Sequence, residues 1–111
     1  GGSGRTLAFG PGHLGASALP GEIGNTIIAG HRDTHFRFLE DVEPGVLIRV
    51  ETAAGQGLLY EVTSIDIVDS RKGSVLLDTQ TAMMTLVTCY PFDARESGGP
   101  LRYVVTAKMK F

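Results

Sequence analysis

The chain has 111 residues and a net charge of −2 at neutral pH, and it lacks the clustered lysine and arginine that nucleic-acid binding requires. Hydrophobic residues make up 42% of the sequence and charged residues 20%, which is typical of a folded globular protein and excludes a disordered chain. No apolar run approaches the ~18 residues that a membrane-spanning helix needs, and no signal peptide is present. We therefore expect one domain over residues 1–111, in which residues 1–4 are a linker or a loop.

The first half of the chain predicts loop, then a strand, then a short helix. Glycines and prolines at residues 10–12 and 19–21 favour loop. Residues 25–31 form an apolar segment that predicts a buried strand. A short helix is expected within residues 34–42, and the Glu-Pro-Gly sequence that follows would end it.

The second half of the chain predicts further strands. Apolar and polar residues alternate over residues 46–51 and again over 101–111, and the run 82–88 is continuously apolar or β-branched. We count about six strands and little helix, which predicts a mostly β protein with short helices. The expected fold class is a closed or nearly closed β-barrel, because closure removes exposed strand edges.

The longest predicted strand, over residues 58–69, changes phase along its length. Tyr60 and Val62 share one face, whereas Ile65 and Ile67 have the opposite parity. Because side chains alternate with a period of two in a strand, this change predicts a bulge or bend near Thr63-Ser64.

The only cysteine, Cys89, ends the apolar run 82–88 and precedes the turn-forming pair Tyr90-Pro91. A single thiol cannot form an internal disulfide or a four-cysteine zinc site. A strand that ends in a lone thiol is suited to presenting a nucleophile, since the thiolate is the reactive form. The alternative is a structural cysteine, because free cysteine is among the most frequently buried residue types.

A histidine and an arginine are candidate partners of this thiol. His31 can act as a general acid toward a departing amine; the alternative is an ordinary surface histidine. The adjacent Gly30 predicts a close backbone approach, and the Asp33 carboxylate can orient or charge the ring. Arg102 can donate hydrogen bonds to a developing oxyanion, although a solvent-facing strand charge explains it equally well.

Three separated motifs occur in one order along the chain. The string AGHR covers residues 29–32, the string TLVTC covers residues 85–89, and Arg102 follows the loop after the cysteine. In these motifs the sequence resembles the sortases, the cysteine transpeptidases that attach proteins to bacterial surfaces. The longer strings AGHRDTHFRFL and TLVTCYPF are most similar to the class D sortases and the sortases of Gram-negative bacteria, and the resemblance extends over residues 7–111.

The resemblance implies an eight-stranded barrel, which has two strands more than we count. Sortases are normally tethered by an N-terminal membrane helix, and their first strands precede the Gly-Pro-Gly region. We therefore expect that the chain lacks the N-terminal strands and the membrane anchor of the family. The resemblance also implies a location on the extracytoplasmic face of the bacterial membrane, in the periplasm or at the cell surface.

The resemblance implies catalytic roles for three residues. Cys89 attacks the backbone carbonyl of an LPxTG-like sorting signal, His31 protonates the departing amine, and Arg102 stabilises the oxyanion. An amine acceptor on the cell surface or on a pilin then displaces the thiol, which completes a two-step acyl transfer. No cofactor is expected, because side chains supply all of these groups.

Three neighbours of the thiol are candidates for substrate binding. The resemblance makes the Thr88 hydroxyl a candidate support for the substrate or the tetrahedral intermediate, although threonine is also a common strand former. Tyr90 and Pro91 can supply an apolar wall for the substrate, although an aromatic residue there can equally fill the core.

Two patterns suggest metal ligation, and neither is adopted. His31 and His35 have the spacing of a helical zinc pair, but we expect His31 to end a strand, and no HExxH pattern is present. The acidic residues Glu40, Asp41 and Glu43 are similar to the calcium-binding region of some class A sortases. Acidic residues beside a Pro-Gly turn are usually solvated, so we expect no metal and keep a calcium site as the alternative.

Two other classes of function stay open. A cysteine peptidase would use the same residues with water as the acceptor. A non-enzymatic surface-binding module of β-barrel type would use none of them. The sequence leaves open the exact sorting signal, the amine acceptor, a housekeeping or pilin role, and the oligomeric state.

Overall fold

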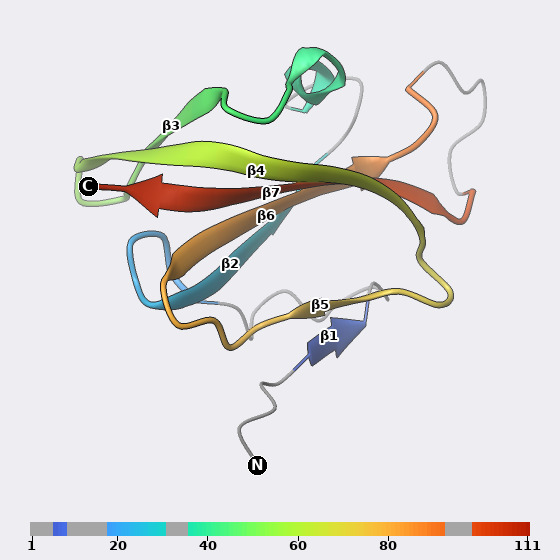
Figure 1. The fold of residues 1–111 in the computed structure, drawn as a ribbon, viewed down its shortest axis with the longest axis horizontal. Helices are drawn as coiled ribbons and strands as arrows, with labels where there is room; N and C mark the ends of the chain where they lie inside the picture. Colours follow the sequence, from blue (N-terminus) through green and yellow to red (C-terminus); the bar gives the residue numbers. More distant parts are fainter. Residues whose placement is uncertain (1–5, 9–17, 31–35, 93–98) are drawn as a thin grey trace.

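The computed structural model describes residues 6–8, 18–30, 36–92 and 99–111, and these residues form mostly β-strands (Figure 1). In chain order the elements are β1 (Thr6–Ala8), β2 (Gly24–Ala29), the 3₁₀ helix η2 (Arg37–Asp41), β3 (Leu47–Glu51), β4 (Gly57–Asp69), β5 (Ser74–Leu76), β6 (Ala82–Cys89) and β7 (Leu101–Lys110). The predicted mostly β fold class is confirmed. Among these residues, no helix has the length and apolar character needed to cross a membrane.

The strands form one five-stranded sheet and one two-stranded sheet. The larger sheet has the order β2-β6-β7-β4-β3, as Figure 1 shows, and the smaller one pairs β1 with β5. Only the β2–β6 pair of the larger sheet is parallel. Within the described residues β2 and β3 are edge strands, because β1 pairs with β5 rather than with β2. The larger sheet is therefore open, which corrects the expected closed or nearly closed barrel.

The bounds of the predicted elements agree with the structure in part. The strand expected over 25–31 is β2, which ends at Ala29, and position 31 lies outside the described residues. The helix expected within 34–42 is the short 3₁₀ helix η2. The sequence did not predict β1 and β5, which are three residues each and too short to show a period.

The predicted bulge in β4 is confirmed. The register between β4 and β7 shifts between Val62 and Ser64, so Thr63 is an extra residue on β4. The shift reverses the parity of the strand, and both Tyr60 and Ile65 therefore pack against the same hydrophobic core. The bulge allows one long strand to keep its apolar side chains on one face along most of its length.

The larger sheet is covered on both faces. We call the face that packs against η2 the η2 face, and its buried core contains Phe36, Leu39, Val42, Leu58, Tyr60, Val62, Met84, Leu86, Phe92, Val105 and Ala107. We call the opposite one the β5 face, and its smaller buried core contains Ile27, Leu77, Val87 and Val104. The half-buried Val68 and Val75 pack against this second core. Because β6 and β7 are covered on both faces, their apolar residues occur at both parities.

Candidate active site

Cys89 and Arg102 are direct partners in the antiparallel β6–β7 ladder. The next pair along the ladder is hydrogen-bonded, because the backbone N–H of Tyr90 donates to the carbonyl of Leu101 at 3.1 Å. Cys89 and Arg102 therefore form a non-hydrogen-bonded pair, in which the two Cα atoms lie about 4.5 Å apart and the side chains share one face. The register alone thus places the thiol beside the arginine side chain.

The thiol is at the point where β6 emerges from the core. Residues 84–88 of β6 are all buried, whereas Cys89 is half-buried and makes no disulfide. It has the parity of Val87, so it lies on the β5 face. This position does not seal the sulfur in apolar packing, which favours the interpretation of Cys89 as a presented nucleophile.

The Arg102 guanidinium is held by the loop before β7. Its Nη1 donates to the carbonyl of Gly99 at 2.6 Å and to the carbonyl of Leu101 at 2.9 Å. Within the part of the chain that the structure describes, Nε and Nη2 have no hydrogen-bond partner. Relative to the described residues, Arg102 therefore has two nitrogens that can donate to an external acceptor, while Nη1 fixes its position.

His31 lies outside the described residues, but the chain that leads to it is described. The backbone N–H of Gly30 donates to the carbonyl of Val87 at 3.0 Å, so residue 30 lies beside β6, two positions before Cys89. Gly30 also packs against an aromatic ring: a Cβ added to it would be 2.7 Å from Cδ2 of Phe36. The predicted close backbone approach at Gly30 is confirmed.

We expect Gly30→Ala to destabilise the protein by about 1–3 kcal/mol, because Phe36 belongs to the core and cannot move aside freely. Urea unfolding measures the effect. Gly57→Ala is the matched control: its added Cβ would meet Nη2 of Arg49 at 2.6 Å, but this is the flexible end of an exposed side chain. Equal free energies of unfolding for the two variants would contradict the role of Phe36.

Aromatic rings support the site from the η2 face. The rings of Tyr90 and Tyr103 are stacked, with centroids 5.9 Å apart, and Phe92 meets Tyr103 edge to face at 5.0 Å. Burial, and then the nearby Tyr90, raise the pKa of the Tyr103 hydroxyl, so this group stays neutral and packs as a core residue. The stacked pair thus connects Tyr90, which follows Cys89, with Tyr103, which follows Arg102.

The three candidate substrate residues lie in different environments. Thr88 is 2% exposed and has the parity of the η2 face, and its hydroxyl has no hydrogen-bond partner among the described residues. Tyr90 is half-buried in the aromatic cluster. Pro91 follows it through a cis peptide bond and is exposed. Pro91 is thus the most accessible of the three.

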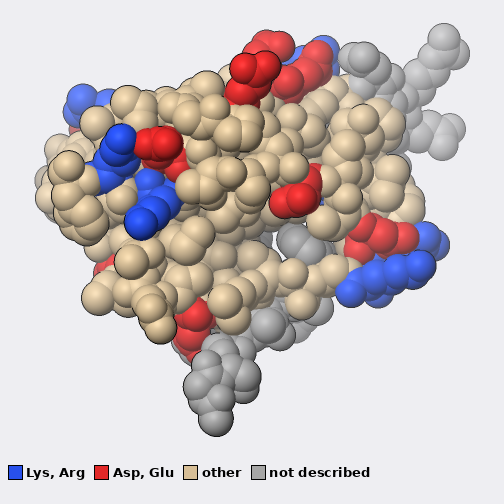
Figure 2. All heavy atoms as spheres, in the orientation of Figure 1, with Lys and Arg blue, Asp and Glu red and all other residues tan. Residues whose placement is uncertain are grey.

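The acidic residues considered for calcium lie on the surface. Glu40, Asp41 and Glu43 are exposed, and Glu40 faces Arg37 at 3.6 Å. In the described ranges, no three potential ligands among histidine, cysteine, aspartate and glutamate come together. On the face shown in Figure 2, acidic side chains gather over η2, and lysine and arginine do not merge into one basic surface.

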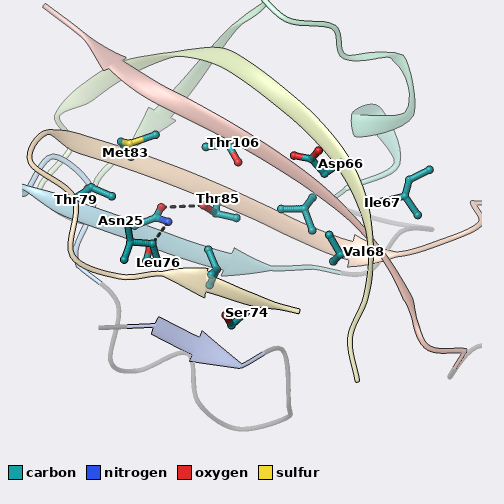
Figure 3. Close-up of a pocket in the computed structure, with 12 residues that line it drawn as sticks. Asn25, Asp66, Ile67, Val68, Ser74, Leu76, Thr79, Met83, Thr85 and Thr106 are labelled. Carbon is teal, nitrogen blue, oxygen red and sulfur yellow. Dashed lines mark hydrogen bonds between the residues drawn. The ribbon is translucent and has the colours of Figure 1, made fainter. Parts of the chain in front are cut away.

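A cavity of about 410 Å³ lies on the β5 face, the same face as Cys89 and Arg102. Its walls combine apolar and polar side chains from β4, β5, β6 and β7, together with Asn25 from β2 (Figure 3). Val75 and Val104 are among the apolar residues, and Asp66 is the one charged residue among the described residues that line the cavity. The sequence did not predict this cavity, because the segment that walls it, β5, carries no strand signal.

The family model of the sortase domain matches residues 1–110 of this chain. The chain belongs to the sortase family. Sortase D of Bacillus subtilis (strain 168) is 35% identical over 103 residues, which are 92% of this chain and 51% of that protein. The predicted family is therefore confirmed, and the chain spans about half the length of this curated relative.

Solved sortases have the same fold. The Clostridium perfringens Sortase D5 transpeptidase superposes with a TM-score of 0.71 at 32% identity, over 86% of this chain and 59% of that one. Sortase A from Corynebacterium diphtheriae has a TM-score of 0.71 at 30% identity, over 86% of this chain and 45% of that one. The open sheet of this sortase chain thus corresponds to part of a larger fold in its relatives.

Proposed function

We propose that residues 1–111 form one sortase catalytic domain in which Cys89 is the nucleophile. The observation that carries the proposal is the cross-strand pairing of Cys89 with Arg102 on the face that holds the cavity. Cys89 attacks the threonine carbonyl of an LPxTG-like sorting signal, and the C–N bond breaks to leave a thioacyl enzyme. A primary amine then attacks the thioester carbonyl, forms a new amide and returns the thiol.

Arg102 supplies the oxyanion donor in this proposal. The carbonyl oxygen becomes negatively charged in both tetrahedral intermediates, and a planar guanidinium can donate to it through more than one N–H. Nη1 is engaged by the carbonyls of Gly99 and Leu101, and Nε and Nη2, which have no hydrogen-bond partner among the described residues, are the donors proposed for this role. A fixed donor costs little reorganisation when the charge develops.

His31 is the proposed general acid. The amine that leaves an amide is a strong base and requires a proton as the C–N bond breaks. The position of Gly30 supports this assignment, because consecutive Cα atoms are about 3.8 Å apart and residue 30 is hydrogen-bonded to β6 two positions before the thiol. Thr88, Tyr90 and Pro91 stay predictions for substrate contact, and exposure favours Pro91 among them.

The substrate and the location follow from the family. We propose that the acyl donor is a secreted protein with an LPxTG-like signal, that the acceptor is an amine on the cell surface or on a pilin, and that the reaction occurs on the extracytoplasmic face of a membrane to which the full-length protein is anchored. The cavity on the β5 face supports a peptide substrate, because it lies on the same face as Cys89 and Arg102 and its lining combines apolar side chains with hydrogen-bonding groups.

A peptide assay tests the proposed function. The protein is incubated with an LPxTG peptide and either glycine or a diaminopimelate amine, and the masses of the products are determined by mass spectrometry. We expect the acyl fragment to appear as an amide with the added amine. Hydrolysed peptide alone supports a cysteine peptidase, and unchanged peptide with every amine supports a binding module and contradicts the proposal.

A further inference from the structure

Asn25 uses all of its polar atoms to join separate segments. Its side-chain Nδ2 donates to the carbonyl of Leu76 at 2.8 Å, and its Oδ1 accepts from the Thr85 hydroxyl at 2.9 Å (Figure 3). Its backbone N–H donates to the carbonyl of Leu77 at 2.9 Å, and its own carbonyl accepts from the N–H of Ala18 at 3.2 Å. Asn25 is 4% exposed, and its bond with Thr85 is buried, so that bond is protected from water.

These contacts attach β5 to the larger sheet. β5 has three residues and pairs in its ladder only with β1, which is equally short. A two-stranded ladder of this length has little stability by itself. The hydrogen bonds from Asn25 to residues 76 and 77 are therefore a principal polar link between β5 and the sheet that carries Cys89.

The segment held by Asn25 forms one wall of the cavity. Ser74, Val75 and Leu76 of β5 line it together with Thr85 of β6, and Figure 3 shows Ser74 and Leu76 on β5 across from Thr85 on β6. In Figure 3 Asn25 lies between Thr85 and Leu76, where the two sides meet. The distance between the walls is thus fixed at the point where the Asn25 side chain bridges them.

The part of the cavity that Thr85 lines is one tetrapeptide length from Cys89 along β6. Thr85 precedes Cys89 by four positions on β6, which is about 13 Å at the rise of a strand. An LPxTG-like signal has four residues on the acyl side of the scissile bond, and an extended tetrapeptide spans about 13 Å as well. This part stays bound through both steps of the reaction, whereas the leaving fragment and the amine exchange.

We propose that Asn25 is a positioning residue: through Leu76 and Thr85 it holds the β5 wall of the cavity and thereby sets the affinity for the acyl side of the substrate. The proposal rests on the proposed function. It assigns to Asn25 no contact with the reacting atoms, so the reaction at Cys89 itself does not depend on it.

Two isosteric variants and two controls test this role. Asn25→Asp replaces the donor that reaches Leu76 with an acceptor, and Thr85→Val removes the hydroxyl that donates to Oδ1. Thr85→Ser keeps that hydroxyl and should rescue the loss. Thr26→Val is the matched control, because the Thr26 hydroxyl is also buried but makes no hydrogen bond with the described residues.

Kinetics separate positioning from general destabilisation. We expect Asn25→Asp and Thr85→Val to raise KM for an LPxTG peptide about tenfold or more, as the loss of one ordering hydrogen bond predicts. The turnover number should stay within about twofold of the wild type, because the β5 wall acts on binding and not on the reaction of bound substrate. The rate of Cys89 alkylation by iodoacetamide should also stay within about twofold, because this small reagent does not need the β5 wall. Thr26→Val should match the wild type in all three measurements, and Thr85→Ser should recover most of the affinity that Thr85→Val loses.

Hydrogen exchange measures the wall directly. Residues 74–77 should lose protection in Asn25→Asp and Thr85→Val but not in Thr26→Val, while β7 stays protected in all of them. An unchanged KM, or unchanged exchange at 74–77, overturns the role of Asn25. A wild-type protein that cleaves no peptide contradicts the proposed function instead, and the exchange data then decide separately whether Asn25 holds β5.

Discussion

Cys89→Ala is expected to abolish acyl transfer while the fold persists. The chain has one cysteine, so no second thiol can replace it. Loss of a catalytic nucleophile that acts with an acid and an oxyanion donor typically lowers turnover by more than about 10³-fold. The substitution removes one atom from a half-buried position at the end of β6, so the free energy of unfolding should change by less than about 1 kcal/mol.

Mass spectrometry and urea unfolding check the two parts of this prediction. Wild-type protein mixed with peptide and no amine should gain the mass of the acyl fragment, and Cys89→Ala should gain none. Cys89→Ser is the second variant, since it retains a hydroxyl of similar size that is a far weaker nucleophile. Substantial turnover by Cys89→Ala would remove the thioacyl enzyme from the mechanism.

The strand signals in the sequence were sufficient for much of the sheet. Alternation over 101–111 predicted β7, and the parity change after Val62 predicted the bulge that the β4–β7 register contains. Both predictions rest on the period of two along a single strand, which is a local property. The close approach at Gly30 was also predicted locally, from a glycine directly beside His31, because glycine has no Cβ.

Local sequence patterns did not predict the contacts between segments that are distant in the chain. β5 has no period to detect, and its attachment to the sheet depends on a hydrogen bond between residues 25 and 76. The buried pair of Asn25 and Thr85 joins positions 60 residues apart, and each residue alone is ordinary in a strand. The open sheet likewise follows from the partner that β1 takes, which no local pattern specifies.

The residues of the candidate site also differ in how far local sequence patterns predict their proximity. Cys89 and Arg102 belong to consecutive strands of the larger sheet, and such strands usually lie side by side, so their proximity follows from topology once both strands are recognised. The strand that precedes His31 is instead parallel to β6 and far from it in sequence. The catalytic role that the resemblance implies for His31 requires this strand to approach Cys89, and the register of β2 with β6 supports such an approach up to Gly30.

Arg102→Lys should cost about 2–4 kcal/mol of transition-state stabilisation, or about 30-fold to 10³-fold in kcat/KM. Nη1 of the guanidinium binds the carbonyls of Gly99 and Leu101, and Nε and Nη2, which have no hydrogen-bond partner among the described residues, are the proposed oxyanion donors. Lysine offers one nitrogen on a flexible stem, so it cannot hold the loop and reach the oxyanion together.

The control for this prediction is Arg49→Lys, which makes the same chemical change on the exposed strand β3, at the far edge of the sheet from β6. Its kcat/KM should equal that of the wild type within about twofold, because an exposed side chain away from the site seldom affects the reaction or the fold. Near-normal kcat/KM in Arg102→Lys would mean that the site needs only a positive charge. The oxyanion role would then be withdrawn, since a lysine preserves the charge and loses the planar set of donors.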